Sequence, residues 1–466
     1  MSHFDIIVIG AGPGGYVAAI RAAQLGKQVA IVERESLGGI CLNWGCIPTK
    51  ALLKSAQVMD YLKHAGDYGI QVSDVQADFN SIIKRSRNVA EGMSKGIQFL
   101  MKKNKIQVIM ATASLSKANT VELVDQEGKK SQITADHIIL ATGGRAKQLP
   151  NLPIDGEIVI DYRKAMSLAK QPKKMVIVGA GAIGVEFAYF YNSIGTQVTI
   201  VEFMEQGLVP REDADVSKEL AKSFKKAGIQ VLANTSVEKV SKTKDGVTVL
   251  TKDRKDGKEN SIDCDIVLSA AGVTANIEQI GLDKLGITTD KGLIKVDANY
   301  QTNIKGIYAI GDIVPGPALA HVASAEGIHC VESICGLKPH PIDYNNIPGC
   351  TYCVPEIASV GYTEAAAVAA GYKIKVGKFP FSASGKASAS GSKEGFVKLI
   401  FDEKYGEFLG AHFIGNNVTE MIAEVVVARN LETTGHEIIK SIHPHPTMSE
   451  AVMEAAAAAY GEVIHI

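Results

Sequence analysis

Two cysteines, Cys41 and Cys46, are separated by four residues in the segment GGICLNWGCIPTK at 38–50. Such a pair can exchange with a substrate disulfide if its two sulfurs reach one another. In a regular helix, residues five apart lie about 7.5 Å apart along the axis, whereas a disulfide needs Cα atoms within about 7 Å. The segment must be distorted if the pair bonds, and Gly45 and Pro48 permit this. The alternative is two buried, inert cysteines.

The chain contains seven cysteines, at positions 41, 46, 264, 330, 335, 350 and 353. An odd, small number in 466 residues argues against a disulfide-stapled secreted scaffold. Any pair that matters is therefore expected to do redox chemistry. Cys350 and Cys353 form a bare C-x-x-C with no second ligand pair, so we interpret them as structural and predict no metal site.

Two glycine motifs could position this chemistry. The segments IIVIGAGPGG (6–15) and MVIVGAGAIG (175–184) each place an apolar run directly before G-x-G-x-x-G, and each is followed by a helical pattern and a second apolar strand ending in Glu. The first glycine permits a tight turn, the second lets the backbone approach a pyrophosphate, the third lets the helix pack on the sheet, and the Glu binds ribose hydroxyls. A glycine-rich turn without a ligand is the alternative for one copy, but the identical spacing of both copies predicts two bound dinucleotides. The residues concerned are Gly10, Gly12, Gly15 and Glu33, then Gly179, Gly181, Gly184 and Glu202.

The two motifs divide the chain. We predict an α/β protein with two Rossmann-like dinucleotide-binding domains, at 1–145 and 146–275, a third stretch at 276–345, and a C-terminal α+β domain at 346–466. Strands are expected at 4–9, 29–33, 137–144, 198–202, 306–312, 395–401 and 408–415, helices at roughly 417–429 and 447–460, and hairpin turns at Lys242–Gly246 and Lys252–Lys258.

Composition narrows the class of protein. Hydrophobic residues make up 46%, charged residues 21%, and the formal net charge is −1, as in an ordinary globular protein. Nothing in this balance favours nucleic acid or an anionic membrane, and the apolar stretches are shorter than the ~18 residues of a membrane span. The first predicted strand begins close to Met1, which leaves no room for a signal peptide. We expect a bacterial cytoplasmic protein or a mature protein of an organellar matrix.

The segment at 38–50 resembles the active-site motif of the flavoprotein disulfide reductases with a C-x4-C pair, and the similarity runs along essentially the whole chain. It implies that the first glycine motif binds FAD and the second a nicotinamide dinucleotide. Cys41 would exchange with substrate, and Cys46 would lie against the flavin. Lys50 resembles the lysine beside the flavin, and Glu186 resembles its ion-pair partner.

The resemblance extends to two further motifs. Gly311-Asp312 and PGPALAH (315–321) are similar to the second FAD motif. In HPHPTMSE (443–450), His445 and Glu450 resemble a catalytic pair that reaches the cysteines of another subunit, which implies a homodimer joined through a C-terminal dimerisation domain. Thr447 and Glu450 also fit a capping box, and both roles stay open for Glu450. The residues implied to contact FAD are further Pro13, Gly14, Arg34, Gly39, Ala113, Thr142, Gly143, Gly144, Asp312, Ala318, Leu319, Ala320 and His321, and those implied to contact the nicotinamide dinucleotide are Ala182, Ile183, Val237 and Gly272.

The second dinucleotide is predicted to be NAD. Glu202 is followed by Phe203-Met204-Glu205, with no arginine pair for a 2′-phosphate, and an acid there repels that phosphate. Within the family, CLNWGCIPTKALL and HPHPTMSEA most resemble the dihydrolipoamide dehydrogenases. That implies oxidation of dihydrolipoamide carried on a lipoyl domain of an E2 acyltransferase or on a glycine cleavage H protein.

Alternatives are an NADH-dependent reductase of another disulfide or a quinone, and a component that keeps the fold without turnover. The intact pairs Cys41–Cys46 and His445–Glu450 argue against the latter. Two departures from the family pattern stand out. Position 44 is Trp where a small residue is usual, and GVTAN (272–276) replaces a Gly-Arg-x-Pro-Asn pattern.

Overall fold

The computed structural model describes residues 2–244 and 246–466. The chain forms two compact units, each built from segments that are distant in sequence. The first unit comprises residues up to Leu52, then Asn80–Lys147 and Gly272–Ile342. The second comprises Leu53–Phe79, Gln148–Ala271 and Asp343–Ile466.

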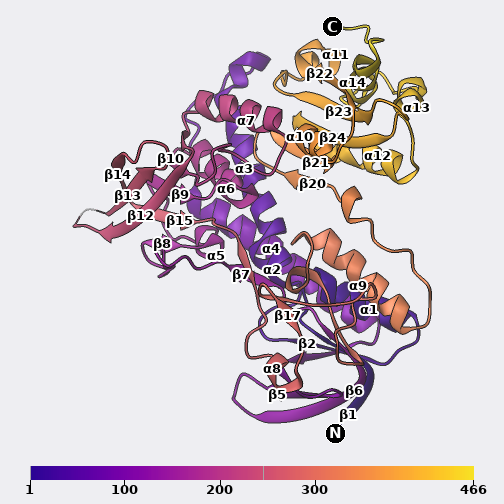
Figure 1. Ribbon diagram of the computed structural model, residues 1–466. Coiled ribbons are helices and arrows are strands. Elements are labelled where there is room, and N and C mark those ends of the chain that lie inside the picture. The colour runs from indigo at the N-terminus through magenta and orange to yellow at the C-terminus, as the bar shows by residue number, and fades with distance from the viewer. Residues whose placement is uncertain (1, 245) are drawn as a thin grey trace. The chain divides into compact units, whose positions relative to one another are not determined.

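The first unit is built on a seven-stranded sheet with the order β3-β2-β1-β6-β5-β4, to which β19 adds beside β6 (Figure 1). Strands β1, β2, β3, β6 and β19 pair in parallel, and Ile7 of β1 lies opposite both Ala30 of β2 and Ile138 of β6. The strand bounds are β1 Ser2–Ile9, β2 Val29–Glu33, β3 Gln107–Met110, β4 Thr112–Lys117, β5 Thr120–Val124, β6 Lys130–Leu140 and β19 Ile307–Ala309.

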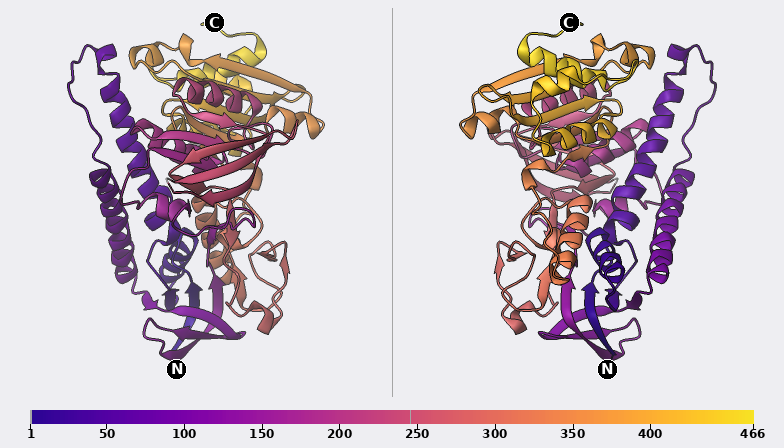
Figure 2. Two further views of the ribbon diagram at one scale, coloured as in Figure 1. Left: turned by 90° about the vertical axis from the view of Figure 1, so that its left-hand side faces the viewer. Right: turned by 90° about the vertical axis from the view of Figure 1, so that its right-hand side faces the viewer.

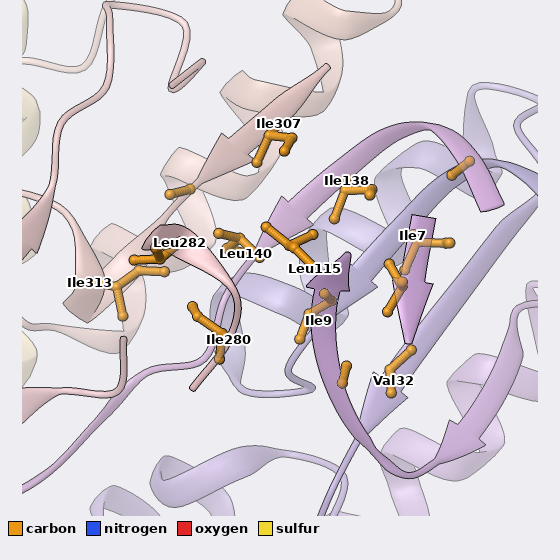
Figure 3. Packing of buried hydrophobic residues seen from close by; sticks show 14 of the residues in the cluster. Ile7, Ile9, Val32, Leu115, Ile138, Leu140, Ile280, Leu282, Ile307 and Ile313 are labelled. Carbon is orange, nitrogen blue, oxygen red and sulfur yellow. The ribbon is translucent and has the colours of Figure 1, made fainter. Parts of the chain in front are cut away.

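Branched apolar residues form the central strands because these strands are covered on both faces. Figure 3 shows the side chains of Ile9, Ile138 and Leu140 packing among residues of later segments, including Ile280 and Ile313. This core joins the first 140 residues to the segment after 272, which belongs to the same sheet through β19.

Two helices of the first unit, α1 (Pro13–Gln24) and α9 (Ala320–Ile334), lie side by side in Figures 1 and 2. They approach closely because each presents a glycine. A Cβ at Gly14 would lie 3.2 Å from the Cβ of Ala323, and one at Gly327 would lie 2.7 Å from the carbonyl oxygen of Gly14. The remaining elements of this unit are α2 Gly39–Trp44, the start of α3 Cys46–Lys63, most of α4 Phe79–Lys103, β7 Gly144–Ala146, β16 Val273–Ala275, α8 Leu282–Leu285, β17 Thr289–Asp290, β18 Leu293–Ile294 and the 3-10 helix η2 Gly311–Ile313.

The second unit contains another parallel sheet, of order β11-β10-β9-β15-β8. A three-stranded antiparallel sheet, β12-β13-β14, is inserted before β15. The bounds are β8 Val159–Ile160, α5 Tyr162–Ala165, β9 Lys174–Val178, α6 Ala182–Ser193, β10 Gln197–Val201, α7 Ala214–Lys226, β11 Gln230–Leu232, β12 Thr235–Lys242, β13 Val247–Asp253, β14 Glu259–Cys264 and β15 Ile266–Ser269.

The C-terminal part of this unit is a five-stranded antiparallel sheet, β20-β21-β24-β23-β22, with helices packed on it (Figure 2). Every residue of β23 and β24 is buried, because α14 and α12 cover this sheet on one side and α7 contacts β24. The bounds are β20 Gly349–Thr351, β21 Glu356–Gly361, α10 Glu364–Ala369, β22 Ile374–Pro380, α11 Gly385–Ala389, β23 Phe396–Asp402, β24 Phe408–Gly415, α12 Val418–Asn430, α13 Gly435–Lys440 and α14 Glu450–Tyr460, with 3-10 helices η3 Tyr344–Asn346 and η4 Phe381–Ala383. The early segment Leu53–Phe79 of the second unit contains the 3-10 helix η1 Ala65–Tyr68.

The predicted fold class agrees with this architecture, with differences at element ends. The strand expected at 198–202 ends at Val201, and the strand expected at 137–144 is the end of β6 followed by the short β7. The last helix begins at Glu450, three residues later than expected. The turn expected at Lys252–Lys258 joins β13 to β14, whereas the turn expected at Lys242–Gly246 includes Asp245, which lies outside the described residues. Within the described ranges, no helix combines the length and apolar character needed to cross a membrane.

Candidate active site

The cysteine pair lies at a break between two helices. Cys41 is inside α2, Gly45 follows the end of that helix with φ −142° and ψ −115°, and Cys46 begins α3. This is the distortion that a C-x4-C pair requires, because an unbroken helix would turn the two side chains to different faces. The sequence predicted a distortion if the pair bonds, which Gly45 and Pro48 would permit, and the structure places the break at Gly45.

The break brings the two thiols together. The Cys46 side chain forms a hydrogen bond with the Cys41 thiol, and neither cysteine is in a disulfide in this structure. That hydrogen bond and burial raise the pKa of Cys41, and the nearby Lys50 ammonium lowers it in part. The two sulfurs are thus placed for the opening and closing of a disulfide, with a cation close by to stabilise a thiolate.

A second contact places this cysteine segment against the first glycine motif. The backbone N–H of Gly38 donates to the carbonyl oxygen of Ala11 at 2.8 Å. A Cβ at Gly39, whose φ is +58°, would lie 2.6 Å from the Cα of Gly12. The two backbones touch at this point, so the redox pair is held directly beside the loop that is predicted to bind a pyrophosphate.

The first glycine motif has the geometry of a nucleotide cradle. A Cβ at Gly10 would lie 2.2 Å from the carbonyl oxygen of Ala141, and one at Gly15 would lie 1.9 Å from that of Gly10, so protein atoms exclude a side chain at both. A Cβ at Gly12 would meet only the Cα of Gly39, at 4.0 Å. No protein group close to position 12 requires glycine there. A pyrophosphate bound against the start of α1 would require it, because a side chain would occupy the space of the phosphates. The residues present therefore fit a dinucleotide.

Glu33 organises this loop. One carboxylate oxygen accepts the Ala11 N–H at 2.8 Å, and the other accepts the Glu35 N–H at 2.8 Å. Glu33 lies in the wall of a cavity of about 410 Å³, the size of a small-ligand pocket. Of the predicted FAD contacts, Gly10, Arg34, Ala113 and Thr142 also line this cavity.

The remaining predicted FAD residues also belong to the first unit. A Cβ at Gly144 would lie 3.3 Å from a carboxylate oxygen of Asp312, so these two meet, and burial raises the pKa of Asp312. Gly143 precedes Gly144 with φ +66°. Ala318 and Leu319 precede α9, Ala320 and His321 begin it, and Pro13 and Gly14 begin α1.

The second glycine motif repeats this geometry in the second unit. A Cβ at Gly179 would lie 2.5 Å from the carbonyl oxygen of Ala270, one at Gly184 would lie 1.9 Å from that of Gly179, and one at Gly181 would meet no atom within 4 Å. Glu202 accepts the N–H groups of Ala180 at 2.6 Å and Met204 at 2.8 Å, as Glu33 does in the first copy. The duplicated sequence motif is therefore a duplicated local structure.

The other residues predicted to contact the nicotinamide dinucleotide lie on several elements and in both units. Ala182 and Ile183 form the first turn of α6, and Val237 is buried in β12. Glu186 is buried in α6, and its carboxylate accepts the Tyr352 N–H at 3.0 Å. Gly272 belongs to the first unit, where its carbonyl oxygen accepts the Lys147 N–H. The pairing of Glu186 with Lys50 stays a prediction.

His445 and Glu450 form the predicted pair. The Nδ1 atom of His445 lies 2.8 Å from one carboxylate oxygen of Glu450, and the other oxygen accepts the Thr447 N–H at 2.8 Å. Burial opposes ionisation of Glu450, but these two hydrogen bonds outweigh it and lower its pKa. The His445 side chain is 77% exposed in the single chain, so its Nε2 side is accessible to a substrate or another subunit.

The capping-box interpretation of Thr447 and Glu450 was wrong in detail. The helix begins at Glu450 after Ser449, so Glu450 occupies its first position and not the third. The Thr447 hydroxyl donates to the carbonyl oxygen of Pro444 and does not cap the helix. Of the two reciprocal hydrogen bonds of a capping box, only the one from the Thr447 N–H to Glu450 is present, and Glu450 forms it together with its bond to His445.

The sequence interpretation missed a second histidine–carboxylate pair. His443 Nε2 lies 2.6 Å from a carboxylate oxygen of Glu424 on α12, and this hydrogen bond raises the pKa of His443. The alternating His-Pro-His-Pro sequence was a signal for His443, but nothing in the local sequence marked Glu424. Arg87, which contacts the cysteine segment from α4, also carried no signal.

The structure defines a nucleotide-linked disulfide oxidoreductase. Its features are two Rossmann-like folds, a helix broken between two adjacent thiols, and an exposed His–Glu pair. Residues 4–327 match the family described as pyridine nucleotide-disulphide oxidoreductase, and residues 347–456 match its dimerisation domain. The chain belongs to the pyridine nucleotide-disulphide oxidoreductase family. This confirms the resemblance, the fold class and the enzyme class expected from the sequence.

Curated relatives cover the whole chain. The dihydrolipoyl dehydrogenase of Zymomonas mobilis is 48% identical over 464 residues, covering 99% of each chain, and that of Rhizobium etli is 47% identical, again covering 99% of each. The crystal structure of LpdA from Mycobacterium tuberculosis has a TM-score of 0.89 at 27% identity, covering 98% of this chain and 99% of that one. These names favour the main functional prediction over the alternative reductases, and the family confirms FAD and NAD(H) as the expected cofactors.

Proposed function

We propose that this protein is a dihydrolipoyl dehydrogenase that oxidises dihydrolipoamide to lipoamide and reduces NAD+ to NADH with release of a proton. One observation carries the proposal: Cys41 and Cys46 lie in hydrogen-bond contact at a helix break that touches the first glycine motif at Gly12. The full-length relatives that bear this name support the choice of substrate.

The residues of the chain divide into two cofactor sites. FAD would be held by the loop Gly10–Gly15, Glu33, the cavity beside Glu33, Asp312 and the α9 N-terminus. When bound, FAD supplies a two-electron carrier between the dithiol and NAD+. The loop Gly179–Gly184 and Glu202 hold NAD, and the buried Glu202 disfavours a 2′-phosphate. In functional terms, 1–145 is the FAD domain, 146–275 the NAD domain, 276–345 the central domain that completes the FAD site, and 346–466 the dimerisation domain.

Five residues carry out the dithiol chemistry. A substrate thiolate attacks the Cys41 sulfur of the Cys41–Cys46 disulfide, which breaks the S–S bond and releases the Cys46 thiolate. The second substrate thiol then displaces Cys41 and forms lipoamide. His445 accepts the proton of the first substrate thiol, passes it to the Cys41 sulfur when the second thiol displaces that sulfur, and takes up the proton of the second thiol. Glu450 orients the imidazole through Nδ1. The Lys50 ammonium stabilises the thiolate that remains on the enzyme.

His445 acts on the cysteines of a second copy of the chain. Its exposure in the single chain and the match to a dimerisation domain support a homodimer in which each active site is shared. The substrate arrives on a lipoyl domain of an E2 acyltransferase or on a glycine cleavage H protein, and the bacterial cytoplasm is the expected location.

Replacement of Cys46 tests the proposal. We expect Cys46→Ala to lower NAD+ reduction by dihydrolipoamide at least about 10³-fold, because no enzyme disulfide can form. Cys335→Ala, at the end of α9 and outside the site, is the matched control and should keep normal turnover. Activity that survives in Cys46→Ala would refute the scheme. A wild-type protein that prefers a quinone or another disulfide to dihydrolipoamide would establish the alternative reductase.

A further inference from the structure

Side chains of α4 form hydrogen bonds with the backbone around the helix break between the two cysteines. Helix α2 ends at Trp44, so its last carbonyl groups have no partners within the helix. The carbonyl oxygen of Asn43 instead accepts a hydrogen bond from Arg87 Nη2 at 2.7 Å. On the other side of Gly45, the carbonyl oxygen of Pro48 accepts one from the Ser86 hydroxyl at 2.9 Å. Two adjacent residues of one helix therefore bind the backbone on both sides of the break.

Arg87 also holds the side chain next to the break. Its guanidinium lies over the Trp44 ring, 4.5 Å from the ring centroid. The Trp44 Nε1–H donates to a carboxylate oxygen of Glu35 at 3.1 Å. Arg87 is half-buried, and burial lowers its pKa. The indole is thus clamped between a cation and a carboxylate, at a position where the family pattern has a small residue.

We propose that Arg87 is a positioning residue for the Cys41–Cys46 couple, which fixes the break at Gly45 and thereby the separation of the two sulfurs. The inference deepens the proposed function and rests on it, because it assumes that the two thiols form the working disulfide. Thiols held side by side lose little freedom when the S–S bond forms, so this bracing favours the disulfide over the dithiol. Loosening the break makes the disulfide easier to reduce.

The test is a redox titration of the purified holoenzyme. Protein is equilibrated in buffers of reduced and oxidised dithiothreitol, which breaks the Cys41–Cys46 bond with two electrons and two protons and becomes a cyclic disulfide. Alkylation and mass spectrometry of the peptide that carries both cysteines then report the oxidised fraction. We expect Arg87→Gln to lower the equilibrium constant for disulfide formation about tenfold, which corresponds to about 30 mV towards more positive potential.

Two further variants separate positioning from other effects. Arg85→Gln is the matched control, because Arg85 lies on the same helix but donates to Ala51, inside α3 and away from the break, so its potential should stay at the wild-type value. Arg87→Lys keeps the charge but lacks the planar fork that binds Asn43 and stacks on Trp44, so its potential should also become more positive. If Arg87→Gln does not fold, Arg87→Lys alone carries the test.

The outcomes distinguish the two proposals. A positioning role for Arg87 would be overturned if both Arg87 variants kept the wild-type potential. It would also be overturned if Arg85→Gln shifted the potential equally, or if Arg87→Gln shifted it and Arg87→Lys did not. A wild-type protein that forms no Cys41–Cys46 disulfide in any of these buffers would instead overturn the proposed function.

Discussion

His445 and Glu450 are joined by a 2.8 Å contact between Nδ1 and a carboxylate oxygen, while the second oxygen of Glu450 is held by the Thr447 N–H. The carboxylate therefore has a fixed orientation and fixes that of the imidazole in turn. Nε2 is left as the ring nitrogen that can exchange a proton. Since the pKa of Glu450 is lowered, its carboxylate stays ionised throughout the neutral range.

Replacing Glu450 with Gln should slow the dithiol half-reaction. Protonated His445 would lose its counter-charge, and part of the ~10²–10⁴-fold contribution of general base catalysis would be lost with it. Stopped-flow measurement of enzyme reduction by dihydrolipoamide reports the rate. Glu424→Gln removes the carboxylate of the neighbouring His443 pair and serves as the comparison. An undiminished rate in Glu450→Gln would assign the orientation of His445 to another residue.

Alanine at Gly12 and at Gly15 should have different effects. Gly12→Ala has room in the protein, so it should leave thermal unfolding of the FAD-stripped protein nearly unchanged and weaken FAD binding by more than tenfold, because the methyl group occupies the place of the pyrophosphate. Gly15→Ala meets the carbonyl oxygen of Gly10 at 1.9 Å and should lower stability by about 1–3 kcal/mol. Calorimetry and FAD titration measure both effects, and equal behaviour of the two variants would contradict the assignment.

Glu202→Ala should not convert the enzyme to NADP. The carboxylate binds the N–H groups of Ala180 and Met204, so its loss disorders the loop as well as removing a repulsive charge. We expect kcat/KM for NAD+ to fall at least about tenfold without a gain with NADP+. Steady-state kinetics with both nucleotides are the measurement. Glu205→Gln, exposed on the same loop, is the control, and efficient use of NADP+ by Glu202→Ala would disprove this role.

Lys50→Met should raise the pKa of Cys41 further. The ammonium lowers this pKa, whereas the hydrogen bond that the Cys41 thiol forms with Cys46 and burial raise it. In the reduced protein, the rate of Cys41 alkylation by iodoacetamide at a given pH should therefore fall, and its pH profile should move to higher pH. Mass spectrometry of the alkylated peptide gives the rate. A profile that stays in place or moves to lower pH would mean that Lys50 does not act on this thiol.

Lys398 should be essential for the stability of the second unit. It is only 2% exposed and contacts Asp213 at 2.9 Å, Asp215 at 3.2 Å and Glu364 at 2.6 Å. Removal of its charge in Lys398→Met leaves Asp213 buried without a cation, which should cost about 3–5 kcal/mol of unfolding free energy. The partly exposed Lys378, 3.2 Å from Asp215, provides the control, and Lys378→Met should change stability by less than about 1 kcal/mol.

The pH dependence of this cluster has a defined sign. Burial favours the neutral amine, but hydrogen bonds to Asp213 and Glu364 raise the pKa of Lys398 to about 12. Its contribution is therefore complete below its ordinary value of 10.5 and is lost as pH rises through about 12. Burial likewise opposes ionisation of Asp213, but the hydrogen bond from Lys398 lowers its pKa, so its contribution is lost only as pH falls below the ordinary carboxyl range. Denaturant titration of wild type and Lys398→Met between pH 3 and pH 12 should show the two curves converging at both extremes, and a constant gap would contradict the charge pairing.

Local features were predictable because their physical causes lie within a few residues of one another. The glycines of both nucleotide loops follow from turn geometry and the close approach of one helix to its own strand, and the contacts of Gly15 and Gly184 bear this out. The need for a distortion in the cysteine segment, if the pair bonds, followed from the Cα separation that a disulfide allows compared with the rise of a helix. Its place at Gly45 came from the structure. The error at the last helix was also local, because the Thr447 hydroxyl found a partner in Pro444.

By itself, the sequence determined the two nucleotide motifs and the candidate cysteine pair, since each is written in a short span with a strong conformational signature. The His445–Glu450 pair was implied only by the resemblance to the family, and the contact at Nδ1 was shown by the structure. Only the tertiary structure decided which distant residues brace them. Arg87 reaches Asn43 because α4 packs on the cysteine segment, Glu424 reaches His443 from another helix, and Lys398 meets Asp213 across 185 positions. Such contacts depend on how elements pack in space, and no periodicity or local spacing encodes them.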